Sequence, residues 1–373
     1  MSRWEEKRLE DIIDVNPPVK LKKGESYPFI DIDKVSPTRR SVTNEEVKVY
    51  DGQSSSKFCD GDTVFSRITP CLENRKIAKV SIDENAAFGS TEFYVFRAKK
   101  KKADARFTYY LTSSDAVVLP AINSMTGASG RQRADKRFIQ RLKLNLPDLP
   151  TQERIADILS AYDDLIEANN RRIELLEQTA QELYKEWFVR FRFPGYENTK
   201  FENGLPEGWK CCRLGKIMSF GAGKTRPESG KTYPVYGGNG ILDYCNYYNN
   251  ENAIIIGRVG AYCGTVYYEP DKCWISDNAL FAESKNNAHF YNYYLLKNMN
   301  LNARQIGTGQ PLITQGLLNK IKILLAPDWL ILKYDRIAFD LLKQQNTLRK
   351  QNINLAEQRD MLLPRLMSGK LGV

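Results

Sequence analysis

The chain repeats itself, and this internal duplication constrains the fold more strongly than any single motif. Residues 128–144 align without a gap on residues 307–323, and both segments run from a small Ser/Thr-Gly loop into an apolar stretch. Three further pairs of segments match, first copy before second: 4–9 with 209–214, 59–68 with 252–259, and 107–111 with 290–295. The duplication predicts two diverged, pseudo-symmetric copies of one α/β (α+β) unit.

A long helix is expected after each copy. Residues 150–153 (PTQE) are typical of a helix start with Thr151 as the cap. Seam positions then recur at alternating steps of four and three: Ile155, Leu159, Tyr162, Ile166, Asn169, Ile173, Leu176, Ala180, Leu183 and Trp187. The polar Asn169 either fixes the register or marks a drift of the stripe toward the surface. A heptad seam of this length predicts packing against a partner helix.

The second helix supplies that partner. After the second copy, leucines fall every seven residues at Leu341, Leu348, Leu355 and Leu362, and Pro364 is expected to end the helix. Two exposed apolar stripes are covered most economically when the helices pack on each other as an antiparallel coiled coil that separates the two units. About 33 residues at ~1.5 Å each give a rod of roughly 50 Å.

The net charge of +10 indicates a polyanionic partner. Residues 97–143 contain twelve Lys and Arg against three Asp, so this stretch alone carries +9. Lysines and arginines gathered in this way neutralise phosphates and release counterions, which favours nucleic acid. Eleven of the twenty tyrosines lie between Tyr233 and Tyr294, where they could contact nucleic acid or pack a sheet. The sequence leaves both readings of these tyrosines open.

Several function classes are disfavoured by the same sequence. Seven cysteines without a C-x-x-C motif predict reduced, cytoplasmic thiols and no metal site, and the apolar runs are too short for a membrane span. The segment 220–225 (FGAGKT) resembles a P-loop end, but Met218 stands where that motif needs glycine. Asn16-Pro-Pro resembles a methyltransferase motif without its aromatic residue or a glycine-rich cofactor loop. With His289 as the single histidine, we expect no catalytic residues.

The order unit, long helix, unit, long helix carries a family resemblance. Residues 146–155 (LPDLPTQERI) at the first junction and 362–371 (LLPRLMSGKL) near the end resemble the DNA-specificity subunit of Type I restriction-modification systems over essentially the whole chain. The second junction departs from the pattern, because residues 326–333 read APDWLILK instead of P-x-x-Q-x-x-I. The resemblance implies these segments: 1–150 as target-recognition domain 1, 151–195 as a central helix, 196–327 as target-recognition domain 2, and 328–373 as a C-terminal helix.

The resemblance also implies a function and partners. In that family the subunit is not an enzyme: it reads the two halves of an interrupted target in double-stranded DNA and docks two modification subunits. Those partners use S-adenosylmethionine to methylate adenine, and restriction subunits add ATP- and Mg-dependent translocation and cleavage, so no cofactor is expected in this chain. Two alternatives are an autonomous DNA methyltransferase with its own recognition domain and a coiled-coil scaffold that binds protein.

The DNA-contacting residues are expected in loops that leave the two units. Arg67 and Arg258 each follow a strand-like run at matching positions of the repeat, and arginine suits guanine through a bidentate pair. An alternative is that both arginines are salt-bridged within their own unit. The complete set of candidates is Arg67, Arg75, Lys76, Ser129, Arg131 and Arg133 in the first copy, and Lys224, Arg226, Arg258, Thr308 and Gln310 in the second.

Overall fold

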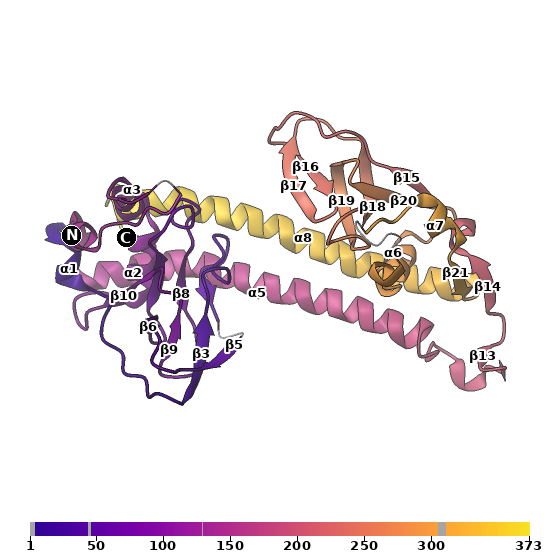
Figure 1. Ribbon diagram of the computed structural model, residues 1–373, viewed down its shortest axis with the longest axis horizontal. Coiled ribbons are helices and arrows are strands. Elements are labelled where there is room, and N and C mark those ends of the chain that lie inside the picture. Colours follow the sequence, from indigo (N-terminus) through magenta and orange to yellow (C-terminus); the bar gives the residue numbers. More distant parts are fainter. Residues whose placement is uncertain (1–3, 44–45, 129, 305–310) are drawn as a thin grey trace. The chain divides into compact units, whose positions relative to one another are not determined.

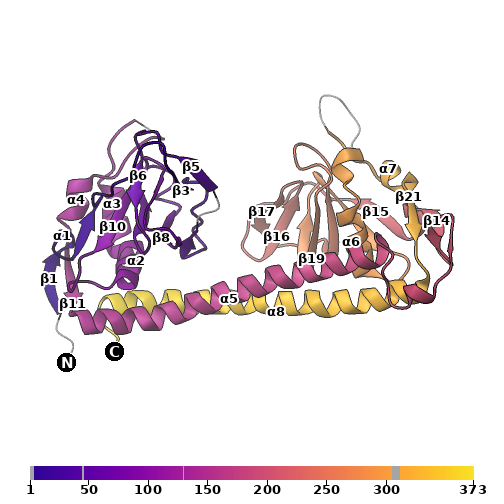
Figure 2. The ribbon, with the colours of Figure 1, turned by 90° about the horizontal axis from the view of Figure 1, so that it is seen from below.

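A computed structural model describes residues 4–43, 46–128, 130–304 and 311–373 (Figure 1). The chain divides into two compact units: unit 1 comprises residues 1–169 and 350–373, and unit 2 comprises residues 170–349. Each unit contains one α/β domain and a part of each of the two longest helices, α5 (Leu149–Phe188) and α8 (Asp328–Met367). Figures 1 and 2 show each of these as one continuous helix.

Unit 1 is built on two sheets and a strand pair. The first sheet has the order β2 (Ile13–Val15), β10 (Phe93–Ala98), β7 (Thr63–Ser66), β8 (Ile77–Val80) and β4 (Ser41–Val42). The second has the order β5 (Glu46–Val49), β3 (Ser26–Ile30), β9 (Ala87–Gly89) and β6 (Ser56–Phe58). The strand pair is β1 (Trp4–Arg8) with β11 (Lys143–Pro147), and the helices are α1 (Leu9–Ile12), α2 (Ala105–Ser113), α3 (Asp115–Asn123) and α4 (Lys136–Gln140).

The first sheet of unit 1 is covered on both faces. Successive side chains of a strand point to opposite faces, so Val64 and Phe65 of β7 enter different apolar clusters. Phe65 packs with Phe107 of α2, and Val64 packs with Phe58 of the second sheet. The four residues of β7 are all buried. This explains why the strand reads as an apolar run rather than as an alternating pattern.

Unit 2 contains one larger sheet. Its order is β15 (Met218–Ala222), β20 (Ala279–Ser284), β18 (Asn250–Gly257), β19 (Val266–Ile275), β16 (Tyr233–Gly237) and β17 (Gly240–Cys245). The strand pairs are β12 (Phe201–Glu202) with β13 (Leu205–Pro206) and β14 (Lys210–Arg213) with β21 (Lys322–Leu325). The helical elements are α6 (His289–Asn298), α7 (Gln315–Lys320), η1 (Tyr196–Asn198), η2 (Leu214–Lys216) and η3 (Leu301–Arg304).

The duplication is visible in matched hydrogen bonds. In unit 1 the N–H of Leu9 donates to the carbonyl of Leu142 at 2.9 Å, and in unit 2 the N–H of Leu214 donates to that of Ile321 at 2.8 Å. The residues that the sequence alignment pairs therefore occupy the same place in the two units. In both units this bond extends an antiparallel pairing of the first strand of the copy with its last strand.

The two long helices run antiparallel within each unit. In unit 1, Arg359 binds Asp163 at 2.5 Å and Asn169 donates to Asn352 at 2.9 Å, so the position along α8 falls as the position along α5 rises. In unit 2, Gln345 donates to Glu177 at 3.3 Å and the hydroxyl of Tyr334 donates to the carbonyl of Ala180 at 2.8 Å, which gives the same direction. The expected fold class, two copies of an α/β domain with two long antiparallel helices, is confirmed.

The start of α5 differs from the prediction. The helix begins at Leu149, and the N–H of Thr151 donates to the carboxylate of Asp148 at 3.1 Å. The prediction that Thr151 caps the helix is therefore wrong, and Asp148 does so. Pro150 is tolerated in the first turn because an N–H there has no partner within the helix. The helix ends at Phe188, inside the expected segment 151–195.

The end of α8 also differs from the prediction. Pro364 lies inside the helix, which continues to Met367, so the expectation that this proline ends the helix is wrong. A proline in the last turn removes only one backbone hydrogen bond, which limits its cost. Beyond Met367 the chain turns at Gly369, whose φ of +69° is left-handed, and the N–H of Leu371 donates back to the carbonyl of Arg365.

Within the described residues, no helix combines the length and the apolar character that crossing a membrane requires.

Candidate nucleic-acid interface

In unit 1, three segments meet where β7 ends. The N–H of Arg67 donates to the carbonyl of Glu92 at 2.9 Å, and the N–H of Ala134 donates to the carbonyl of Arg67 at 2.9 Å. These bonds hold the strand end, the turn before β10 and the loop before α4 together. The side chains that leave this junction are Arg67, Glu92 and Arg133, and we call them the unit 1 cluster.

The unit 1 cluster is an acid between two arginines. Glu92 accepts from Nε of Arg67 at 3.2 Å, and from Nε and Nη2 of Arg133 at 2.9 and 2.6 Å. The guanidinium of Arg67 also lies 5.5 Å from the ring centre of Tyr94. The bonds from Arg133, together with the charge of Arg67, lower the pKa of Glu92 although partial burial acts in the opposite direction. Glu92 is therefore ionised and holds both arginines at neutral pH.

Unit 2 repeats the backbone of this junction without its acid. The N–H of Arg258 donates to the carbonyl of Asn278 at 3.0 Å, and the N–H of Ile313 donates to the carbonyl of Arg258 at 2.9 Å. Asn278 therefore occupies the position of Glu92. The Nη1 of Arg258 lies 3.5 Å from the carbonyl of Asp277, and its buried Nε has no partner among the described residues.

The other basic candidates fall into two groups. Arg75 pairs with Asp115, and Arg226 pairs with Asp243. Lys76 donates to a backbone carbonyl, that of Ile32, at 2.9 Å. The remaining members, Arg131 and Lys224, are exposed and their side chains have no partner among the described residues, while Ser129, Thr308 and Gln310 lie outside those residues.

The ion pair between Arg226 and Asp243 is reinforced by further hydrogen bonds to the carboxylate. Its partner Asp243 also accepts from Ser229 at 2.6 Å. That hydrogen bond, a backbone hydrogen bond from Tyr244 and the arginine lower the pKa of Asp243 to about 2. The carboxylate therefore stays charged, and Arg226 is held within unit 2.

The tyrosines of unit 2 divide between the two roles that the sequence left open. Seven of the eleven are buried or half-buried, among them Tyr291, Tyr293 and Tyr294 of α6. Four are exposed: Tyr244, Tyr247, Tyr248 and Tyr262. The majority thus serve packing, and a minority present rings at the surface.

The motifs that the sequence disfavoured have structural explanations. A Cβ added to Gly223 would lie 2.0 Å from the carbonyl oxygen of Ser276, so this glycine permits close backbone packing. Asn16 has a φ of +56°, and its side-chain oxygen accepts from the N–H of Val95 at 2.9 Å. His289 is the first residue of α6, and burial lowers its pKa to about 4, so it is neutral at pH 7.

The predicted seam residues are buried to different depths. Ile155, Leu159, Asn169, Ala180 and Trp187 are buried. The other predicted seam residues are half-buried: Tyr162, Ile166, Ile173, Leu176, Leu183, Leu341, Leu348, Leu355 and Leu362. On α8 the fully buried positions lie beside the leucine stripe, at Leu330, Ile331, Tyr334, Ala338, Leu342, Gln345 and Leu366.

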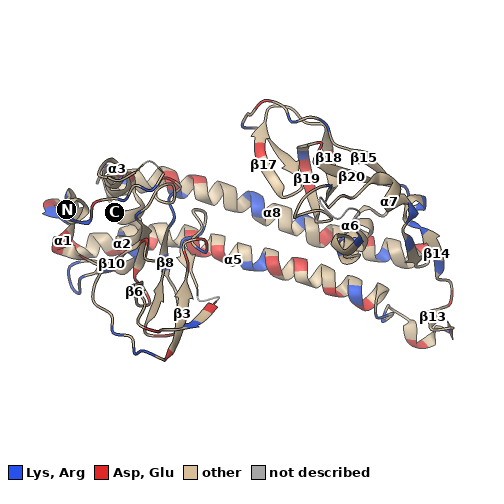
Figure 3. Cartoon of the chain, in the orientation of Figure 1, with Lys and Arg blue, Asp and Glu red and all other residues tan. Residues whose placement is uncertain are grey.

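Polar residues that the sequence analysis missed contribute to the seam. Glu177, Gln345, Asp163 and Arg359 make contacts between the two helices, in addition to the asparagine pair. Glu177 also binds Lys297 of α6 at 2.6 Å, and Tyr294 donates to it at 3.0 Å. Charged residues of both signs follow one another along α5 and α8 (Figure 3). The sequence shows no feature that separates the seam charges from those on the exposed faces.

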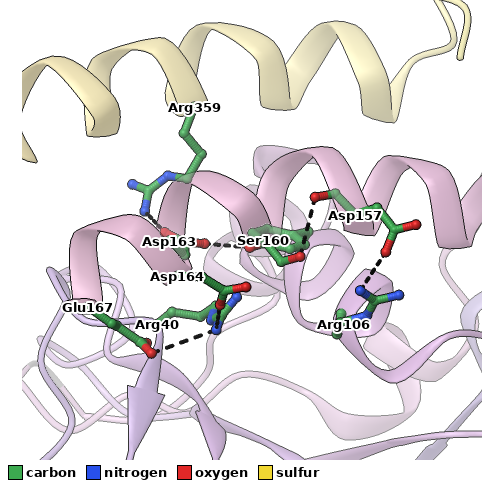
Figure 4. Close-up of polar contacts among 9 residues, drawn as sticks. Arg40, Arg106, Asp157, Ser160, Asp163, Asp164, Glu167 and Arg359 are labelled. Atoms are coloured by element: carbon green, nitrogen blue, oxygen red, sulfur yellow. Dashed lines mark hydrogen bonds and ion pairs between the residues drawn. The ribbon is translucent and has the colours of Figure 1, made fainter. Parts of the chain in front are cut away.

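In unit 1, acids of α5 bind three arginines from other segments (Figure 4). Asp157 binds Arg106 of α2 at 2.6 Å. Asp164 binds Arg40 at 2.5 Å, and Glu167 lies 3.7 Å from the same guanidinium. The third arginine is Arg359 of α8, which binds the buried Asp163; Tyr110 of α2 donates to the same carboxylate.

In unit 2, aromatic rings form the corresponding contact. Phe188 of α5, Tyr334 of α8 and Tyr291 of α6 pack together, with ring centres 5.3 Å apart for Phe188 and Tyr334 and 4.9 Å apart for Phe188 and Tyr291. The hydroxyl of Tyr334 donates to the carbonyl of Ala180 at 2.8 Å. Tyr184 closes the cluster at 5.6 Å from Tyr334.

Comparison with known proteins gives one consistent result. Residues 1–178 and 206–357 match the family described as Type I restriction modification DNA specificity domain. The specificity subunit of the Type I restriction enzyme MjaIX from Methanocaldococcus jannaschii is 24% identical over 422 residues, covering 99% of this chain and 94% of that protein. The specificity subunit of HindI from Haemophilus influenzae is 32% identical over 148 residues, 39% of this chain and 31% of that protein. The crystal structure of a Type I restriction-modification S subunit from M. genitalium has a TM-score of 0.58 at 18% identity, covering 98% and 96% of the two chains.

Proposed function

Because the chain belongs to the Type I restriction modification DNA specificity family, we propose that it reads a two-part DNA target for a modification and restriction complex. Each unit reads one half of the target. The chain itself is non-catalytic, and the modification subunits supply the methyl transfer. Its relatives MjaIX and HindI are named as specificity subunits of Type I restriction enzymes, which supports this assignment.

The observation that carries the proposal is the matched pair Arg67 and Arg258. Both follow the last residue of a central strand, and both are held by the same two backbone hydrogen bonds. A duplicated frame that presents an arginine with different neighbours in each copy suits a protein that reads two different short sequences. The net charge of +10 supports attraction to the phosphates.

The long helices fit a second task. Each has 40 residues, which corresponds to about 60 Å of helix at ~1.5 Å per residue. We propose that they set the spacing between the half-sites and dock two modification subunits that bind S-adenosylmethionine. Restriction subunits that use ATP and Mg complete the assembly in the cytoplasm.

Methylation mapping tests this proposal. Host DNA is sequenced for methylated adenine with the gene intact, with the gene deleted, and with the modification subunit alone. We expect methylation at an interrupted sequence only when the chain and the modification subunit are both present. Methylation of that sequence by the modification subunit alone would refute the proposal.

Two binding measurements separate the alternatives. The purified chain should bind no S-adenosylmethionine, whereas an autonomous methyltransferase would bind it stoichiometrically. The assembled complex should bind target DNA with an affinity that falls steeply with salt, because phosphate contacts release counterions. A coiled-coil scaffold for protein partners would show no such DNA binding.

A further inference from the structure

Glu92 is an unexpected residue to find beside a DNA-reading arginine. A carboxylate repels phosphates, so an acid at a nucleic-acid surface weakens binding unless it has another task. Glu92 is one-fifth exposed, and the arginines that it holds, Arg67 and Arg133, are 29% and 45% exposed. The unit 1 cluster is thus partly open to solvent, so DNA could reach its arginines.

The atoms that Glu92 uses suggest its task. It binds Arg67 through Nε, and this contact does not occupy the two terminal Nη groups. It binds Arg133 through Nε and Nη2, which leaves Nη1 outside the contact. The contact with Glu92 itself therefore leaves the terminal nitrogens of Arg67 outside the bond, and these are the groups that an arginine can present to the O6 and N7 atoms of guanine.

Holding an arginine in this way lowers the cost of recognition. A free arginine side chain samples many rotamers, and part of this conformational entropy is lost when it binds. Glu92 fixes Arg67 from the Nε side, and the ring of Tyr94 lies beneath the guanidinium. A guanidinium group that is already oriented before DNA binds discriminates between bases more sharply than a mobile one.

We propose that Glu92 is a specificity-determining positioning residue, which orients Arg67 toward a guanine edge in the half-site that unit 1 reads, with Arg133 holding the carboxylate in place from its other side. This inference rests on the proposed function. Asn278 marks the difference in unit 2, where Arg258 has no carboxylate partner among the described residues and the same backbone position holds a neutral amide. The two half-sites are therefore read by arginines of which one is held by a carboxylate and the other is not.

The alternative is that the unit 1 cluster only stabilises unit 1. The two roles predict different effects of removing the charge. If Glu92 is only structural, its neutralisation changes folding stability and strengthens binding to all DNA alike, because one negative charge has left the surface. If Glu92 positions the arginines, the ratio of cognate to random binding falls, and it falls for one half-site alone.

The test uses Glu92→Gln in the chain assembled with its modification subunits. Binding is titrated at two salt concentrations on the mapped target, on targets with single changes in each half-site, and on random DNA. We expect the ratio of cognate to random affinity to fall about tenfold, with relaxed preference at guanine positions of one half-site and unchanged preference in the other. Random DNA should bind equally well or slightly better.

Two further variants keep the outcome decisive. Glu73→Gln removes the same charge from an exposed position of unit 1 and should leave the ratio unchanged. Glu92→Asp keeps the charge but shortens the reach, so it should relax the same positions, and it decides the question if thermal unfolding shows that Glu92→Gln does not fold. An unchanged ratio in a folded Glu92 variant overturns the inference. A wild-type complex without any half-site preference would instead overturn the proposed function.

Discussion

Unit 1 and unit 2 contain the same repeated domain, yet their contacts with the long helices differ in chemistry. Both contacts include apolar residues, but unit 1 adds several arginines bound to acids of α5, whereas unit 2 adds a cluster of packed aromatic rings beside the ion pair of Lys297 with Glu177. Ion pairs depend on direction, salt and pH, and packed rings depend mainly on shape. The duplication thus preserved the backbone frame while the attachment to the helices diverged.

The largest effect is expected in the aromatic cluster of unit 2. Tyr334→Ala removes a fully buried ring, and the resulting cavity should lower the free energy of unfolding by about 3–5 kcal/mol. Chemical denaturation followed by tryptophan fluorescence measures this, because Trp187 lies in the same cluster. Tyr334→Phe is the control, since it loses only the bond to Ala180 and should cost about 1 kcal/mol. Equal losses in the two variants would contradict the role assigned to packing.

A somewhat smaller loss is expected at the buried acid of unit 1. Asp163→Ala leaves the guanidinium of Arg359 and the hydroxyl of Tyr110 without their shared acceptor, which should cost about 2–3 kcal/mol. Thermal and chemical unfolding give the difference from wild type. The neighbouring Asp164→Ala is the control, because that side chain is 62% exposed and its loss should cost no more than about 1 kcal/mol.

The acid in the seam of unit 2 should make stability depend on pH. Glu177 is partly buried, but Lys297 and the hydrogen bonds to its carboxylate lower its pKa. Its contribution is therefore complete above the pKa of the unfolded chain and is lost as pH falls through the lowered folded-state pKa. Glu177→Gln should cost about 1 kcal/mol at pH 7 and progressively less in acid. A cost that stays constant down to pH 2 would exclude this linkage.

The smallest effect is expected at the exposed pair Arg106 and Asp157. The carboxylate of Asp157 is 64% exposed, so Arg106→Ala should cost about 0.5 kcal/mol or less. Salt should reduce even this difference, because exposed charges are screened within about 10 Å at 0.1 M. Unfolding of wild type and variant at low and high salt checks both statements. A cost above that of Asp163→Ala would reverse the order of the contacts in unit 1.

The sequence predicted the duplication and the two helices because both rest on repeated apolar patterns. Apolar positions are numerous and periodic, so residues 128–144 can still be aligned on residues 307–323 although the two copies have diverged in sequence. The caps were predicted less well. Thr151 was predicted to cap the start of α5 and Pro364 to end α8. In the structure Asp148 caps α5, and the left-handed Gly369 lies just beyond the end of α8. Both pairs of residues are typical of helix ends and lie only a few positions apart, so the sequence alone does not choose between them.

The cluster around Glu92 could not be predicted, because one glutamate among 45 acidic residues has no distinguishing pattern. A signal does exist in hindsight. Ser90 and Ser276 each donate a backbone N–H to an earlier strand, and Glu92 and Asn278 follow two residues later. Extending the repeat alignment beyond Arg258 would have paired these positions and revealed the exchange of an acid for an amide.

The polar residues of the seam have a consequence for how such a protein can change its length. Gln345, Asn352 and Arg359 follow one another at intervals of seven on α8, each with a polar partner on α5. Deleting one heptad from both helices removes one polar contact and keeps the others in phase, whereas a deletion of another size sets charged groups against apolar ones. One heptad is about 10 Å of helix, close to three base-pair steps of ~3.4 Å. We therefore expect the two helices to tolerate changes of length best in whole heptads, so that the length of the pair varies in steps rather than continuously.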